Sequence, residues 1–101
     1  MGQLFPYQFA PLKPLGFDGN AITTSDAVTL SVPAGAQGAL IQASGGNINW
    51  TDNGVDPTSA AGGGMVLTAD AEPSWFPVGL LETLSFIAVG SSTFLLVSYY
   101  G

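Results

Sequence analysis

The chain has 101 residues, a length that suits a single domain with a modest core. It contains no cysteine and no histidine, which excludes a disulfide framework, thiolate chemistry and the side chain that most readily exchanges protons near neutral pH. Seven acidic residues stand against one basic residue, for a net charge of −6, and this sign disfavours binding to nucleic-acid phosphates or to anionic lipid.

Residues 1–18 combine three prolines with apolar side chains. Prolines this dense prevent a helix, remove backbone donors and favour an extended path. Because the segment is apolar, we predict an arm at 1–18, followed by a folded domain at 19–101. The arm would lie on a neighbouring subunit or, as an edge strand, on its own domain. Its predicted contact residues are Leu4, Phe5, Tyr7, Phe9, Leu12, Leu15 and Phe17.

From Asp26 onward, alternation of apolar and polar residues predicts strands. Gly45-Gly46 predicts a hairpin between two of them. About seven short strands, with no helical periodicity over three turns, predict an all-β fold: a small antiparallel β-sandwich of jelly-roll type. The predicted strands are 27–32, 39–44, 47–51, 65–69, 74–78, 83–89 and 93–100, with a single helical turn near 79–82.

The loop INWTDNGVDPTSAAGGG, residues 48–64, raises the question of a ligand site. Asp52, Asn53 and Asp56 offer oxygens that would suit Ca²⁺, but their spacing does not match an EF-hand loop. The same residue types dominate ordinary turns. We therefore favour a structural loop with an exposed tip that holds no metal, with Ile48 and Trp50 pointing inward from the strand before it.

The sequence shows no constellation for catalysis, and we predict a protein that is not an enzyme and needs no cofactor. Its serines have no histidine to activate them. The acidic pairs Asp52 with Asp56 and Asp70 with Glu72 have no arginine or histidine nearby to orient them.

Three aromatic residues near the C-terminal end are predicted surface contacts: Trp75, Tyr99 and Tyr100. If 93–100 is a strand, the two adjacent tyrosines point to opposite faces, so one ring is available to a partner. The alternative use of these rings, together with Trp50, is a platform for a carbohydrate.

Several segments together resemble small head and tail structural proteins of tailed bacteriophages and prophages. These segments are ALIQA at 39–43, the W-x-D-N-G-x-x-P-T core at 50–58, Gly64 with Leu67, and LVSYY at 96–100. The chain departs from the pattern at Thr51 and Asn53, where Arg and Asp are usual, and residues 1–18 are not part of it.

The resemblance implies a virion structural protein, and first of all a capsid decoration or cement protein. Such a protein would bind the lattice of the major capsid protein and neighbouring copies of itself, as a homotrimer on the capsid surface. A head-fibre, neck or tail component is one alternative. A module that binds carbohydrate or the host surface is another.

The low proportion of charged residues agrees with an assembled subunit. Only 8% of the residues are charged, against about 25% in typical globular domains, so we expect neighbours to cover much of the surface. A secreted domain with an uncharged polar surface is the alternative. Residues 1–10 show no Sec-type signal, and we expect synthesis in the cytoplasm of a bacterial host.

Overall fold

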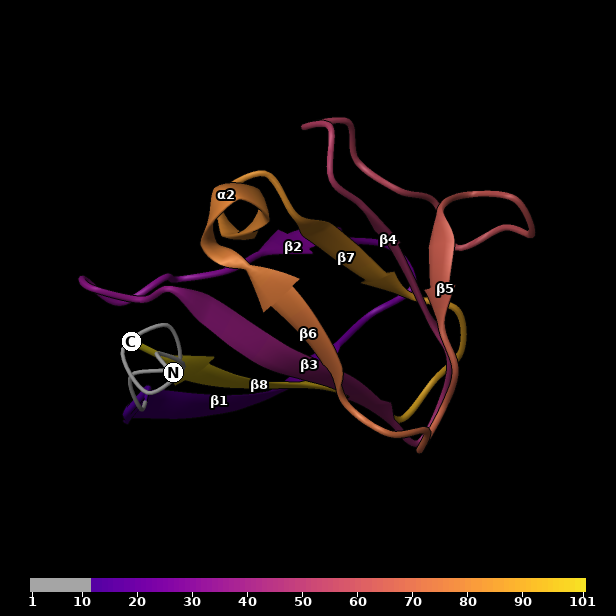
Figure 1. Ribbon diagram of the computed structural model, residues 1–101. Helices are drawn as coiled ribbons and strands as arrows, with labels where there is room; N and C mark the ends of the chain where they lie inside the picture. The colour runs from indigo at the N-terminus through magenta and orange to yellow at the C-terminus, as the bar shows by residue number, and fades with distance from the viewer. Residues whose placement is uncertain (1–11) are drawn as a thin grey trace, which may run out of the picture.

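Two four-stranded antiparallel sheets pack face to face in the computed structural model, which describes residues 12–101 (Figure 1). Sheet A has the order β1-β8-β3-β6, with bounds Pro14–Ile22, Thr93–Tyr100, Gly38–Ser44 and Ser74–Pro77. Sheet B has the order β2-β7-β4-β5, with bounds Val28–Thr29, Ser85–Ala88, Ile48–Thr51 and Met65–Leu67. The helix α2 (Val78–Leu81) closes one end of the sandwich.

This strand order is that of an eight-stranded jelly roll, so the predicted fold class is confirmed. Among the strands described, only β4 and β5 are consecutive in the chain and paired with each other; every other connection passes to a non-neighbouring strand. No helix within residues 12–101 is long and apolar enough to cross a bilayer.

The hairpin predicted around Gly45-Gly46 is wrong, because β3 belongs to sheet A and β4 to sheet B. The two glycines instead carry the chain from sheet A to sheet B. This connection between β3 and β4 packs against the connection between β7 and β8. A Cβ on Gly45 would lie 2.3 Å from the carbonyl oxygen of Ser92, and one on Gly46 would lie 2.4 Å from Oγ1 of Thr93. Glycine is therefore required by close backbone approach.

β1 extends across the predicted boundary between residues 18 and 19. It pairs with β8 from Pro14 opposite Tyr100 to Ile22 opposite Thr93. Residues 14–18 thus belong to the sandwich, in agreement with the alternative that part of this segment forms an edge strand on its own domain. Of the predicted arm contacts, Leu12, Leu15 and Phe17 are exposed at or in this strand. Leu4, Phe5, Tyr7 and Phe9 lie outside the described residues.

The core fills the space between the inner faces of the two sheets. Ile41 and Val97 reach it from sheet A, and Ile48 and Phe86 reach it from sheet B; all four are fully buried. Leu81 of α2 seals one end. At the predicted inward position, Trp50 packs edge-on against Phe76 of β6, with 5.0 Å between ring centroids. Burial of these apolar side chains is the main stabilising term of the fold.

Candidate functional site

The outer face of sheet A carries a group of exposed aromatic and aliphatic side chains, which we call the aromatic face. Alternation along β8 produces it, because every second residue from Thr93 to Tyr99 is buried and the residues between them point outward. The register places outward residues of the other strands beside those of β8. The aromatic face consists of Phe17 (β1), Leu40 (β3), Trp75 (β6), and Phe94, Leu96 and Tyr100 (β8).

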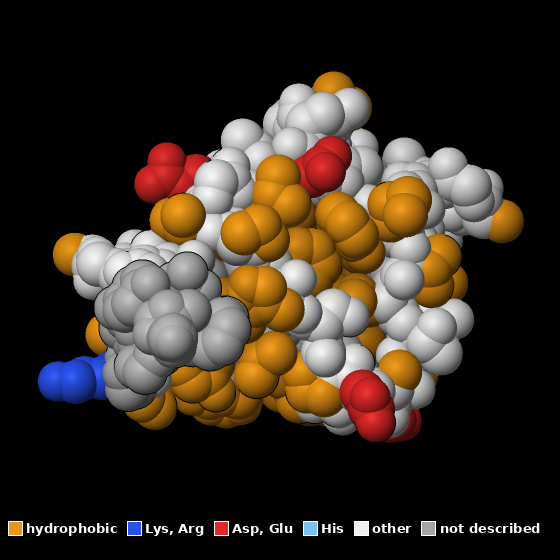
Figure 2. All heavy atoms as spheres, in the orientation of Figure 1, with side chains coloured by type: hydrophobic (Ala, Val, Ile, Leu, Met, Phe, Trp, Pro, Cys, Tyr) orange, Lys and Arg blue, Asp and Glu red, His pale blue; other side chains and the backbone are white. Residues whose placement is uncertain are grey.

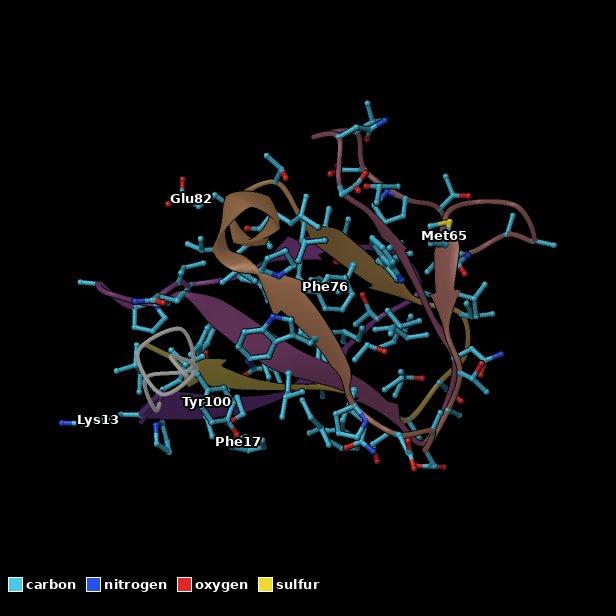
Figure 3. All side chains as sticks on the ribbon, viewed as in Figure 1. Lys13, Phe17, Met65, Phe76, Glu82 and Tyr100 are labelled. Carbon is cyan, nitrogen blue, oxygen red and sulfur yellow. The ribbon has the colours of Figure 1, made fainter. Side chains whose placement is uncertain are left out.

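Three of these rings are largely open to solvent. Phe17 is 63% exposed, Trp75 46% and Phe94 44%. Figure 3 shows Phe17 and Tyr100 on the same side of sheet A, whereas Phe76 points toward sheet B. Exposed apolar groups that gather in one patch, rather than singly, mark an interaction surface.

Trp75 is held in place by the strand beneath it. A Cβ on Gly38 would lie 2.1 Å from Cζ2 of Trp75, so the absence of a side chain there lets the indole lie against β3. The indole also contacts Tyr100, with 6.0 Å between ring centroids and a 46° tilt. The two rings therefore form a supported surface before any partner arrives, which lowers the entropy lost on binding.

No charged side chain belongs to the aromatic face. In the part of the chain that is described, every acidic residue except Asp18 lies in a loop or at the C-cap of α2. Asp18 is in β1, opposite the buried Val97, and so lies on the inward side of sheet A. Figure 2 shows hydrophobic side chains across the middle of the side on which β6 lies, with one carboxylate at the upper border of this area and others at the outline. Charge depletion with Trp, Tyr and Phe at the centre is the composition of a protein–protein interface core.

The prediction that Tyr99 is a surface contact is wrong, because its side chain is buried. Its ring lies on the inner face of β8 and is only 2% exposed, so the outward ring of the tyrosine pair is that of Tyr100. The Tyr99 hydroxyl is buried and has no hydrogen-bond partner among the described residues. Burial, and secondarily the negative charge of Asp18, raise the pKa of the Tyr99 hydroxyl above its usual value of 10.

This raised pKa predicts a loss of stability at alkaline pH. Above about pH 10, Tyr99 of the unfolded chain loses its proton while the folded chain keeps it, so the free energy of unfolding falls as pH rises toward the folded-state pKa. We expect urea unfolding between pH 8 and 11.5 to show a steeper decline for the natural chain than for Tyr99→Phe. Parallel curves would show that Tyr99 titrates alike in both states.

The loop from 52 to 64 has an exposed tip at residues 52–56, as expected, and its later part is tied to β4 of sheet B. The side-chain amide of Asn49 donates to the carbonyl oxygens of Thr58 and Ala60, at 2.8 and 3.0 Å. The hydroxyl of Ser85 donates to Asp56 at 3.3 Å. The hydrogen bond to Asp56 places the loop beside Ser85 on the outer side of β7, in agreement with the burial of Ser85.

Of the three candidate calcium ligands, two accept hydrogen bonds from the protein and the third is exposed to solvent. Asn53 accepts the amide of Val55 at 3.1 Å, as in an ordinary turn, and Asp56 accepts the hydroxyl of Ser85. Asp52 is exposed. Within residues 12–101, no group of three or more His, Cys, Asp or Glu side chains is placed to hold a metal ion. The geometry is that of a structural loop.

The structure brings together Trp75, Tyr100 and Phe17, which were predicted separately. It adds Phe94, Leu40 and Leu96, which the sequence reasoning missed; the strand assigned to 93–100 already places Phe94 and Leu96 on the same side as Tyr100. It separates the asparagine-rich strand β4 from the aromatic residues, because they lie on different sheets. A scan against protein-family models, a search of curated proteins and a search of solved structures each found no match for the chain.

Proposed function

We propose that this protein is a non-enzymatic structural subunit of a bacteriophage particle that binds neighbouring subunits through the aromatic face. The observation that carries the proposal is the uncharged aromatic face itself, on a chain whose net charge is −6. Two such chains, or this chain and another acidic surface, repel each other, and the repulsion is smallest when the faces that meet carry no charge. Contact through the aromatic face meets this condition and buries apolar area.

A protein partner suits this face better than a carbohydrate does. Sugar binding needs polar groups beside the stacking rings. The amide of Gln42, on the same side of β3, already donates to the carbonyl of Ala71 at 2.7 Å. Asn49 is in β4 of the other sheet and its side chain donates to the loop, and Asn47, just before β4, accepts the amide of Ala69. A glycan module remains the second class to test, by glycan-array binding.

The assignment to a phage particle rests on the resemblance of residues 28–100 to small virion proteins. Jelly rolls recur in viral capsid domains and also in lectins, so the fold is compatible with the proposal and supports it only by analogy. Within the particle, we favour capsid decoration: a homotrimer that bridges copies of the major capsid protein and opposes expansion of the head. A neck, tail or head-fibre position is the alternative.

The first test locates the protein on particles. We expect antibodies against the purified chain to label the heads of phage particles whose genome encodes it, and gold on the tail would support the alternative position. Particles from which the protein is absent would refute the proposal.

The second part of the test concerns the aromatic face. A double variant, Phe17→Ser with Trp75→Ser, should fold but lose incorporation into particles. The matched control is Val55→Ser with Val66→Ser, which removes two similarly exposed apolar side chains from the region of sheet B. Equal incorporation of both variants would contradict a role for the aromatic face.

A further inference from the structure

The tip of the loop between β4 and β5 carries an asparagine followed by a glycine, Asn53-Gly54, in open surroundings. All residues from 52 to 56 are exposed, and Figure 1 shows this part of the chain projecting past the end of β4. Beyond the chain neighbours of Gly54, no described atom lies within 4 Å of the place that a Cβ would take. Water and hydroxide therefore reach the peptide bond between these two residues from solvent.

A hydrogen bond directs the side chain of Asn53 toward the backbone nitrogen of Gly54. Oδ1 of Asn53 accepts the N–H of Val55 at 3.1 Å. The ring that this bond closes contains both Cγ of Asn53 and the backbone nitrogen of Gly54. The N–H of Val55 also draws electron density from the side-chain carbonyl, and it would stabilise the negative charge that develops on Oδ1 when a nucleophile attacks Cγ.

Two further hydrogen bonds keep the turn in this shape. The hydroxyl of Thr51 donates to the carbonyl oxygen of Val55, and the hydroxyl of Ser85 donates to Asp56. Both bonds limit the conformations that the segment between them can adopt. Because the fold already holds Cγ of Asn53 near a backbone nitrogen, less entropy is lost when a bond forms between the two atoms.

We propose that Asn53 is a site of spontaneous deamidation in the folded protein. Hydroxide removes the proton of the Gly54 N–H, and the nitrogen attacks Cγ of Asn53. The bond from Cγ to Nδ2 then breaks, and ammonia leaves a five-membered succinimide. One water molecule opens this ring. Attack of water at Cγ gives aspartate in an ordinary backbone, whereas attack at the backbone carbonyl carbon gives isoaspartate. The overall step consumes one water and releases one ammonia.

The three other asparagines of the chain lack these conditions. Asn20 lies in β1 and Asn49 in β4, where the backbone is paired with neighbouring strands. Asn49 is also buried, and its amide donates to two carbonyl oxygens. Asn47 is followed by Ile48, whose β-branched side chain crowds the attacking nitrogen. Asn53 alone is followed by glycine, which has no side chain to hinder the attack.

Conversion would change both the charge and the geometry of the loop tip. Either product adds one negative charge to a chain whose net charge is −6, in a segment that already contains Asp52 and Asp56. Isoaspartate also adds one carbon atom to the backbone path from Thr51 to Val55, so the hydrogen bond between these residues would have to rearrange. The site belongs to a loop beside sheet B, whereas the aromatic face lies on sheet A, so the inference does not depend on the proposed function.

The test incubates the purified full chain in H₂¹⁸O at pH 7 and pH 9 and then analyses chymotryptic peptides by mass spectrometry. We expect the peptide that follows Trp50 to gain the mass of an amide-to-acid conversion with one ¹⁸O, and to gain it faster at pH 9. Electron-transfer fragmentation should divide the product into aspartate and isoaspartate forms.

The peptide that ends at Trp50 is the internal control, because it contains Asn47 and Asn49. Conversion at Asn53 should be at least about tenfold faster than in this control peptide, since neither control asparagine is held beside an unhindered nitrogen. Equal rates in the two peptides would overturn the proposal.

A blocked synthetic peptide of residues 50–57 separates the effect of the fold from that of the sequence. The hydrogen-bonded turn should make Asn53 convert at least as fast in the folded chain as in the free peptide. Conversion about tenfold slower in the folded chain would overturn the proposal, because the fold would then protect Asn53 from attack.

Two variants test the chemistry. Gly54→Ala should slow conversion severalfold, because a methyl group beside the attacking nitrogen hinders ring closure. It is measured in the free peptide as well as in the chain, because the φ of +82° at Gly54 strains an alanine in the folded turn. Asn53→Gln should stop conversion on the same time scale, since its side chain would have to close a slower, six-membered ring. Equally fast conversion in both variants would overturn the proposal.

Discussion

Replacing Gly45 by alanine is expected to lower the free energy of unfolding by about 2–5 kcal/mol. Gly45 has φ of +83°, a left-handed conformation that costs an L-residue roughly 1–2 kcal/mol. Its new Cβ would also lie 2.3 Å from the backbone carbonyl oxygen of Ser92, which no side-chain rotation can relieve. The two crossovers between the sheets would have to separate, and overpacking of this kind costs about 1–3 kcal/mol.

Gly54→Ala is the matched control. Gly54 has nearly the same φ, +82°, but nothing lies within 4 Å of the position its Cβ would take. Only the conformational cost of about 1–2 kcal/mol should remain. Urea unfolding of both variants, followed by tryptophan fluorescence, therefore isolates the packing cost as their difference. Equal losses of stability would mean that the two crossovers are not in close contact in solution.

Two phenylalanines are expected to differ strongly in how much stability is lost when each is replaced by alanine. Phe86 of β7 is fully buried in the core, and its truncation should cost about 3–5 kcal/mol of unfolding free energy. Phe94 of β8 is 44% exposed on the aromatic face, so Phe94→Ala should cost less than about 1 kcal/mol. Chemical unfolding of the two variants measures both values.

The same pair separates stability from association. If the aromatic face binds neighbouring subunits, Phe94→Ala should retain the native fold and lose incorporation into particles. A variant that loses stability as severely as Phe86→Ala would instead place Phe94 in the core. If Phe94→Ala is stable and fully incorporated, Phe94 is not part of the interface, and Trp75 and Tyr100 would be tested next.

The fold class was predictable from the sequence because apolar and polar residues alternate in segments such as 28–32 and 47–51, and because 93–100 is rich in β-branched and aromatic residues. Strand pairing was not. Gly45-Gly46 signals a change of direction, but a hairpin and a crossover between sheets both need such a turn, and only the contact with Ser92 distinguishes them. Likewise β2 is limited to Val28–Thr29, because sheet B offers only the short strand β7 as a partner.

The candidate site was predictable only in part. Adjacent tyrosines in a strand must face opposite sides, but which of them faces outward depends on where the second sheet lies. The structure resolves this for Tyr100, whose ring joins that of Trp75 from a strand that is not its neighbour in sequence or in the sheet. The orphaned hydroxyl of Tyr99 has no sequence signal, because it arises from what the surrounding residues fail to provide.

The pairing of β1 with β8 also determines how the folded chain would respond to mechanical force. Lys13 and Gly101 are joined by two backbone hydrogen bonds, of 2.8 and 2.9 Å, at the end of this antiparallel pair. Tension applied between those two residues would break the hydrogen bonds between β1 and β8 one after another, starting at this end, and would need little force. Tension on β1 against the aromatic face would run along the strands, perpendicular to their hydrogen bonds, and would load the whole ladder in shear. If the aromatic face is the attachment surface that we propose, a force at residue 13 opposed at Trp75 and Phe94 would meet this shear resistance.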